Sequence, residues 1–446
     1  MYSFWLLIRQ DQSTGYAATY LPDTPEMIIP PEDTTNKLKE LMRKYHDSSM
    51  DDINVPGSEK KSLFANLLGY FLEEFAFNVA YGLDTNLSTT VRHGEFEGVV
   101  KKSFELKSLL VNDEGSQSDW FVEKYFSACL LDEKEEVRSQ LIKFGKSVKE
   151  LISLYLDKYI RVRTTESSDG CFNFYSTQDD RDELMRKFNS NVSYDDFFKL
   201  LLSYSWSLVD VSMDVLKSQL DTEFRMAVNK SVDRLLNVLK KYRNGVEDEG
   251  YLSTIVSAKE EFNAELDGAI SWFERPADIE DKPCSLFLVV DVALKQTNNC
   301  YVKHEVYLSD KSLLDVKICG TAFKSMVGIL YILLQNIVLH SNISSRRLPV
   351  KLEVSESSKF LEIKLTHKMY GDFDFKETES DFESAVKNYQ RDNALKMARK
   401  EGGSGLSKIW RISHFELQSE SQLNMRVTQD GDVLIDLKFL KETILL

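Results

Sequence analysis

Cysteine is scarce in this chain of 446 residues, and its five copies are scattered. No two of them form a CxxC pair, so the spacing indicates neither a zinc site nor a framework of disulfide bonds. This cysteine usage fits a reducing cytosol. The five residues are Cys129, Cys171, Cys284, Cys300 and Cys319.

An excess of basic charge and long apolar runs are also lacking. The 56 lysines and arginines are outnumbered by 71 aspartates and glutamates, whereas a nucleic-acid surface needs clustered basic residues. The apolar start, residues 1–9, is too short for a signal peptide. The most apolar stretch, Met326–Leu339, falls short of the ~20 residues of a membrane helix. We therefore expect a cytoplasmic protein with no membrane or nucleic-acid partner indicated.

The first 276 residues are patterned mostly as helices. Apolar side chains recur at helical spacing in four segments, Lys61–Tyr81, Glu133–Val162, Tyr194–Tyr242 and Tyr251–Phe273. In the third segment they approach heptad spacing from Val209 to Val238, which predicts a helical hairpin or a dimer seam. We expect a mostly helical region at 1–192, a long helical hairpin at 193–276 and a separate module at 282–446, with assembly into a homodimer or a larger complex.

A glycine-rich run near the C-terminus has the composition of a phosphate cradle. Residues 400–410 read Lys-Glu-Gly-Gly-Ser-Gly-Leu-Ser-Lys-Ile-Trp. Small residues let consecutive backbone N–H groups approach an anion, and a helix that starts near Leu406 adds the positive end of its dipole. The alternative is an ordinary turn that caps a helix.

A second unusual segment, Met326–Asn342, is a strongly apolar helix that carries Gln335, Asn336 and His340 in its last turns. Asn336 and His340 are four residues apart and therefore lie on one face. Buried amides and imidazoles cost desolvation unless they find partners, so this face points to a binding site. The alternative is a final helical turn that reaches solvent.

These two segments resemble the N-box and the second glycine box of the GHKL ATPases, the superfamily of gyrase, Hsp90, histidine kinases and MutL. The resemblance covers roughly residues 282–446. It implies an α+β protein, with a largely α-helical N-terminal half followed by a GHKL-type α/β sandwich. The flanking patterns fit this order. They predict strands at Ser285–Val292 and Val302–Tyr307, a hairpin of Lys351–Val354 with Phe360–Leu365, a helix at Asp381–Arg399 in a lid of residues 372–401, and a hairpin of Leu423–Thr428 with Val433–Phe439.

The resemblance also implies a site for ATP and Mg²⁺, in which Asn336 is the metal ligand. The remaining nucleotide-binding residues expected from it are His340, Gly371, Gly402, Gly403, Ser404, Gly405 and Leu406. Two positions depart from the family pattern. Ile332 stands where hydrolytic members have a glutamate base, so we expect slow ATP hydrolysis at most. His367 stands where an aspartate binds adenine, which leaves only Gly371 of the first glycine box, with Asp372 and Asp374 as nearby substitutes.

The run Arg92-His93-Gly94-Glu95 admits several interpretations. It resembles the signature of histidine phosphatases, and its arginine and histidine resemble those of the helical HEPN nucleases, but the flanking sequence fits neither family. A turn in which Arg92 and His93 tie helices together is favoured, and a ligand or partner contact is second. The chain has no histidine between Gly94 and Lys303, which excludes a phospho-accepting histidine on the long helices.

Two functional hypotheses follow. In the first, the protein is a nucleotide-dependent conformational switch, in which ATP and Mg²⁺ order the lid and reposition the helical half. In the second, it is a non-enzymatic dimerisation or adaptor protein with a vestigial GHKL fold. By analogy alone, such a module on a helical partner points to a bacterial stress or antiphage defence component.

Overall fold

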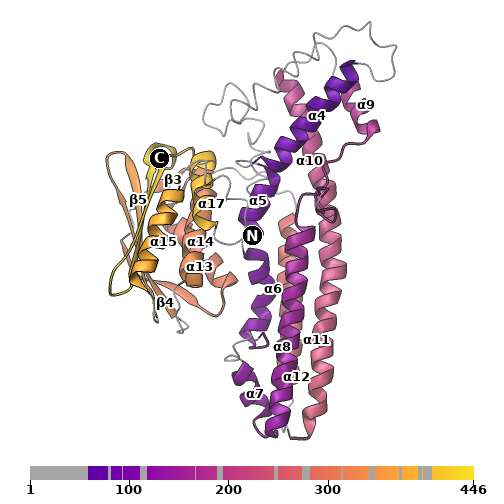
Figure 1. The fold of residues 1–446 in the computed structure, drawn as a ribbon, viewed down its shortest axis with the longest axis vertical. Helices are drawn as coiled ribbons and strands as arrows, with labels where there is room; N and C mark the ends of the chain where they lie inside the picture. Colours follow the sequence, from indigo (N-terminus) through magenta and orange to yellow (C-terminus); the bar gives the residue numbers. More distant parts are fainter. Residues whose placement is uncertain are drawn as a thin grey trace.

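The computed structural model describes residues 59–78, 82–92, 94–110, 118–165, 167–187, 194–245, 250–273, 282–312, 315–340, 347–370, 374–389, 394 and 404–445. Two hydrophobic cores divide these residues. One core runs from Phe64 to Phe273, and the second runs from Leu286 to Ile444. Figure 1 shows the first part as an elongated helical bundle and the second as a sheet with helices against it. The described parts of the expected regions 1–192 and 193–276 share the first core.

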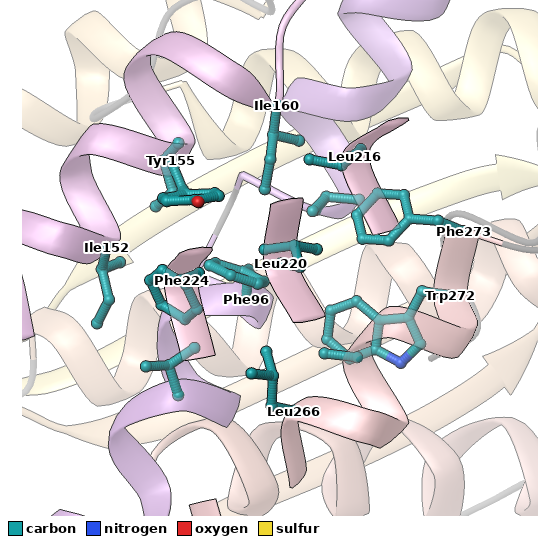
Figure 2. Close-up of a cluster of buried hydrophobic side chains, with 14 of the residues drawn as sticks. Phe96, Ile152, Tyr155, Ile160, Leu216, Leu220, Phe224, Leu266, Trp272 and Phe273 are labelled. Atoms are coloured by element: carbon teal, nitrogen blue, oxygen red, sulfur yellow. The ribbon is translucent and has the colours of Figure 1, made fainter. Parts of the chain in front are cut away.

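The helical half is a bundle in which a short π-helical turn, η3, joins two helices into one long rod (Figure 1). Phe224 of this turn packs on Phe96 and Tyr155, with ring centroids 5.6 and 4.7 Å apart, at the centre of the core (Figure 2). The elements are α4 (Glu59–Phe77), α5 (Leu83–Thr90), α6 (Glu95–Leu106), α7 (Ser118–Phe126), α8 (Leu131–Leu154), η2 (Tyr155–Tyr159), α9 (Gln178–Lys187), α10 (Tyr194–Gln219), η3 (Leu220–Phe224), α11 (Arg225–Leu239), η4 (Lys240–Gly245), α12 (Gly250–Ile270) and η5 (Ser271–Phe273).

The apolar stripe that suggested a dimer seam packs inside the core of the helical half. Val209, Met213, Leu216, Leu220 and Phe224 are each at most 3% exposed and belong to the core of the helical half. These residues are therefore not available to a second copy. A homodimer stays a prediction, and it would need another surface.

The C-terminal half is a two-layer α/β sandwich with a five-stranded sheet in the order β2-β4-β5-β7-β6. Strands β2 and β4 are parallel, and the other neighbours are antiparallel. Helices α13, α14 and α17 lie between this sheet and the helical half (Figure 1). The elements are β1 (Cys284–Ser285), α13 (Leu286–Cys300), β2 (Glu305–Ser312), β3 (Lys317–Ile318), α14 (Gly320–His340), β4 (Arg347–Glu356), β5 (Phe360–Lys368), α15 (Phe375–Asn388), α17 (Gly405–Arg411), η6 (Ile412–Glu416), β6 (Ser421–Val427), β7 (Asp432–Leu440) and η7 (Lys441–Thr443).

Both predicted hairpins are present, as β4–β5 and β6–β7, but the predicted strand Ser285–Val292 is wrong. This segment begins helix α13, where the Ser285 hydroxyl caps the helix by accepting a hydrogen bond from the Leu288 N–H (3.3 Å). The buried residues Leu286, Val289, Val290 and Ala293 follow helical spacing. The cap and this packing outweigh the strand propensity of the valines.

Helix α14 is the central helix of the sandwich. Among the described residues it is the one helix long and apolar enough to cross a membrane, which corrects the shorter run counted from sequence. Most of its residues are buried in the core of the C-terminal half, as expected for a core helix packed on a sheet. The predicted helix Asp381–Arg399 also shifts, because Asp374 caps an earlier start by accepting hydrogen bonds from the N–H groups of Lys376 and Glu377.

Candidate functional site

A large cavity opens between the two halves of the protein. Its volume is about 1280 Å³, enough for a nucleotide together with water. The helical half contributes one wall through Gly94, Glu97, Lys101 and Glu105 of the α5–α6 region. The remaining walls come from the segment Cys300–His304 at the end of α13, from α14, α15 and α17, and from strands β5, β6 and β7 or residues next to them. Both halves of the protein therefore form the cavity.

The end of α14 and the start of α17 meet at this cavity. A Cβ atom at Gly405 would lie 3.1 Å from Asn336 Nδ2, 3.2 Å from Asn336 Oδ1 and 3.2 Å from Ile332 Cγ2. A Cβ atom at residue 405 would crowd the side chains of Asn336 and Ile332, so glycine at this position lets the α17 backbone lie close to the Asn336 amide. The two segments singled out in the sequence thus form one corner of the cavity.

The other expected site residues divide into three groups. His340 and Leu406 line the cavity, His340 from the exposed end of α14. Ser404 is fully buried just before α17. Gly371, Gly402 and Gly403, as well as Asp372, lie outside the described residues. The Asp374 carboxylate caps α15, so it does not replace the aspartate of the first glycine box.

A buried histidine also lines the cavity. His367 is 7% exposed, and its Nδ1 atom has no hydrogen-bond partner among the described residues. Burial lowers the pKa of His367 to about 4, with opposing effects from the Lys368 backbone and Asp432 and a further lowering by His340. The ring is therefore neutral at physiological pH.

Ion pairs line the wall that the helical half supplies. Lys101 pairs with Glu97 one turn earlier on α6, and Lys303 pairs with Glu105 at 3.4 Å, across the two halves. Helix α6 also approaches the backbone of α13, because a Cβ at Gly98 would lie 2.7 Å from Cys300 Cα. All six of these residues line the cavity, and the close contact at Gly98 is possible because glycine has no side chain.

The run Arg92-His93-Gly94-Glu95 was expected to form a turn in which Arg92 and His93 tie helices together. The structure confirms this role for Arg92. The guanidinium donates to the Asp84 carboxylate (3.0 Å) and to the carbonyl of Ile160 (3.1 Å), inside the helical half. Glu95 is 4% exposed and accepts a hydrogen bond from Gln296 of α13. His93 lies outside the described residues. The turn therefore joins helices and also lies at the junction of the two halves.

A buried lysine connects the glycine-rich segment to the helical half. Lys408 of α17 is 0% exposed, and its Nζ donates to the carbonyl of Ser88 (3.0 Å). Ser88 lies in the last turn of α5, where helical carbonyls lack intrahelical partners and attract cations. A shift of α17 would therefore reach α5 through this contact.

Sequence reasoning missed the helical wall and the role of Lys408. Glu97, Lys101 and Glu105 recur every four residues on α6, but such a charged stripe usually faces solvent, and nothing local distinguishes it. No group of three histidine, cysteine, aspartate or glutamate residues in the described part of the chain could hold a metal ion alone. Mg²⁺ often binds through one or two protein ligands together with substrate phosphates, so Asn336 fits a metal that arrives with a nucleotide.

Comparisons with known proteins divide the chain at the same place as the two cores. Residues 27–273 match the family model Y4jQ, and residues 285–440 match the model described as "y4jQ C-terminal putative histidine kinase domain". The uncharacterized protein y4jQ of Sinorhizobium fredii (strain NBRC 101917 / NGR234) is 19% identical over 366 residues, which are 80% of this chain and 34% of that protein. The chain thus spans about a third of the length of this curated relative.

Two solved structures are similar to part of the chain. The Acinetobacter baumannii histidine kinase AdeS is 13% identical, with a TM-score of 0.24, and the match covers 47% of this chain and 95% of that one. The histidine kinase domain of the Erythrobacter litoralis EL346 blue-light activated kinase is 12% identical, with a TM-score of 0.26, over 48% of this chain and 97% of that one.

Proposed function

The chain belongs to the Y4jQ family and has a C-terminal part of GHKL type, and from this premise we propose that it is a nucleotide-dependent conformational switch. ATP with Mg²⁺ binds in the cavity between the halves, and its phosphates change the contacts that hold the helical half. The observation that carries the proposal is the composition of the cavity, whose walls come from both halves.

The phosphate end of the site is the corner formed by Asn336 and Gly405. The Asn336 amide oxygen would hold Mg²⁺ that arrives with the nucleotide, and residues 404 and 405, the described part of the glycine-rich run, would offer backbone N–H groups to the phosphates. The 3.1–3.2 Å spacing between Asn336 and the Cβ position of Gly405 supports this assignment, because it brings an amide and an unobstructed backbone to one point. His340 and Leu406 complete the lining on either side.

The switch itself is electrostatic. Two cavity lysines, Lys101 and Lys303, are paired with carboxylates of α6, namely Glu97 and Glu105. A triphosphate brings several negative charges, so it competes with these glutamates for the lysines. Because the Lys303–Glu105 pair joins the halves, its loss changes how α6 is held against the C-terminal half. The second link, from Lys408 to Ser88, carries a shift of α17 to α5.

Hydrolysis is not required for this function. Ile332 is 1% exposed and faces the Gly405 corner, where a hydrolytic enzyme of this type would place its general base. An alkyl side chain takes no proton, so ATP acts as a ligand that is turned over slowly.

Thermal unfolding tests the proposal against the adaptor hypothesis. A nonhydrolysable ATP analogue at 100 times its Kd stabilises the protein by ~2.7 kcal/mol if it binds only the folded state. We expect the melting temperature to rise with Mg²⁺ and analogue, and Asn336→Ala and Gly405→Ala to abolish the rise while they remain folded. An unchanged melting temperature at millimolar analogue would support a vestigial site and an adaptor protein.

We also propose that the protein forms a homodimer and acts in stress or antiphage defence. A homodimer through a surface other than the buried stripe is tested by sedimentation at micromolar concentration, where a strict monomer would contradict it. A cytoplasmic role in stress or antiphage defence is tested by phage plaque counts on cells that express the wild type or Asn336→Ala. Equal counts would contradict a defence role that depends on nucleotide binding.

A further inference from the structure

The turn between α5 and α6 contacts both halves of the protein. On the helical side, the Arg92 guanidinium donates to the carbonyl of Ile160 (3.1 Å), the residue that follows the π-helical turn η2. In the first turn of α6, the Phe96 ring packs on Phe224 of the π-helical turn η3, with ring centroids 5.6 Å apart (Figure 2). On the opposite side, Gly94 lies against the last part of α14. Within five residues, the chain thus connects the C-terminal half to two π-helical turns of the bundle.

Gly94 rests on a hydrogen bond that lies next to the Asn336 corner of the cavity. Gln335 is 3% exposed, and its Nε2 atom donates to the hydroxyl of Tyr301 (2.5 Å). A Cβ atom at Gly94 would lie 2.9 Å from each of these two atoms. Gly94 also has a φ of +94°, a left-handed conformation that favours glycine. Because Gln335 directly precedes Asn336 in α14, a shift of Asn336 would reach Gly94 through this hydrogen bond.

Polar contacts hold the start of α6 against the C-terminal half. Glu95 is 4% exposed and accepts a hydrogen bond from Gln296 of α13, and the Lys303–Glu105 pair joins the halves two turns further along α6. Two parts of a chain that meet through polar contacts can move relative to one another more easily than parts joined by a large apolar interface. The start of α6 can therefore change its position when its neighbours on α14 do.

The two π-helical turns are the elements that can respond to such a movement. Tyr155 of η2 packs on Phe224 of η3, with ring centroids 4.7 Å apart (Figure 2), and the Tyr155 hydroxyl donates to the carbonyl of Gln219, just before η3 (3.3 Å). Turns of this kind are rare, occur often at functional sites, and are places where long helices kink. Because Arg92 contacts the end of η2 and Phe96 contacts η3, a movement of α6 would change the bend of two helices at one level.

We infer that Gln335 transmits nucleotide occupancy to the helical half, and that Gly94, Arg92 and Phe96 pass the change on to η2 and η3. This inference rests on the proposed function and adds an output to it, namely a change in the bend of α8 and of the α10–α11 rod. Gln335 is a positioning residue here, because its amide holds the hydrogen bond on which Gly94 rests. The role of the Arg92-His93-Gly94-Glu95 run is then to join the cavity to the π-helical turns.

Tyr301→Phe tests this inference by removing one oxygen atom, the acceptor of the Gln335 hydrogen bond. Hydrogen–deuterium exchange of the full chain is compared with and without a nonhydrolysable ATP analogue and Mg²⁺. In the wild type we expect the analogue to change exchange at residues 152–160 and 216–224. Tyr301→Phe should lose most of this change, while the analogue still binds in calorimetric titration and still changes exchange in α14 and α17.

Tyr125→Phe is the matched control. The Tyr125 hydroxyl is also hydrogen-bonded to a side chain, Thr254 Oγ1 (2.7 Å), but this pair lies inside the helical half and away from the cavity. The variant should keep the full change at residues 152–160 and 216–224. Gln335→Met breaks the same hydrogen bond as Tyr301→Phe, so the double variant should lose no more of the change than either single variant.

Four results would contradict parts of this scheme and can be told apart. A full change at the π-helical turns in Tyr301→Phe would overturn the inference, and so would a wild type that responds in α14, α17 and α6 but not at these turns. Loss of analogue binding in Tyr301→Phe would also overturn it, because Tyr301 would then belong to the binding site. No response of the wild type anywhere in the chain would contradict the proposed function itself.

Discussion

Gly98 provides a test of how the two halves are joined. Replacing it with alanine places a Cβ atom 2.7 Å from Cys300 Cα, 2.8 Å from Cys300 Cβ and 2.8 Å from Cys300 O. These contacts are shorter than van der Waals contact and involve backbone atoms, so α6 and α13 must move apart. Overpacking of this kind costs ~1–3 kcal/mol, against a gain of ~0.5–1 kcal/mol from replacing a helical glycine. We expect a net loss of up to ~2.5 kcal/mol from these two estimates, with a central value of ~1 kcal/mol.

Gly268→Ala is the matched control for this substitution. Gly268 is also a helical glycine, in α12, but nothing lies within 4 Å of its Cβ position, so the variant should gain ~0.5–1 kcal/mol. Urea unfolding followed by circular dichroism measures both changes. Opposite shifts of the two midpoints would fit the described contact. If Gly98→Ala were as stable as Gly268→Ala, then α6 would not lie against Cys300, and the wall of the cavity would have another origin.

Three further predictions concern the site and its surroundings. Lys408→Met leaves the buried Ser88 carbonyl without its 3.0 Å hydrogen bond and should lower the free energy of unfolding in urea by ~1–3 kcal/mol. The control Lys387→Met, at an exposed lysine, should lower it by less than ~0.5 kcal/mol. Equal effects would contradict the link between α17 and α5. Ile332→Glu should hydrolyse ATP faster than Ile332→Gln, by up to ~10²–10⁴-fold, because the glutamine has a similar cost of burial but cannot act as a base. Rapid hydrolysis by the wild type would contradict the claim that the general base is missing. The pKa of His367, about 4 in the folded protein, lies below its ordinary value of 6.5, so the unfolded chain binds more protons between these two pH values. The free energy of unfolding should therefore fall by up to ~3 kcal/mol as the pH drops from 6.5 to 4. His367→Asn should remove this part of the pH dependence.

The elements that could be predicted from sequence are those whose local pattern agrees with their packing. The β4–β5 and β6–β7 hairpins alternate apolar and polar residues around turns, and the burial of their strands alternates in the same way. Helix α14 was recognised because it is apolar around most of its circumference. The start of α13 was misread, because Leu286–Val292 is rich in residues that favour strands and its helical spacing is only clear over the full length to Cys300.

The site was only half visible in the sequence. Asn336 and Gly405 were singled out because amides and glycines are unusual at those places, and the structure brings them together. Glu97, Lys101 and Glu105 have no such local signature, since a charged stripe on a helix normally faces water. Their position at the cavity depends on the packing of α6 against α13, which is a contact between residues about 200 positions apart in the chain.

The central claim is that one nucleotide is sensed by both halves of the protein. Hydrogen–deuterium exchange of the full chain, with and without a nonhydrolysable ATP analogue and Mg²⁺, measures this directly. We expect changed exchange in α14 and α17 and also in residues 83–106 of the helical half, with both changes absent in Asn336→Ala. Changes confined to the C-terminal half, or none at all, would contradict it.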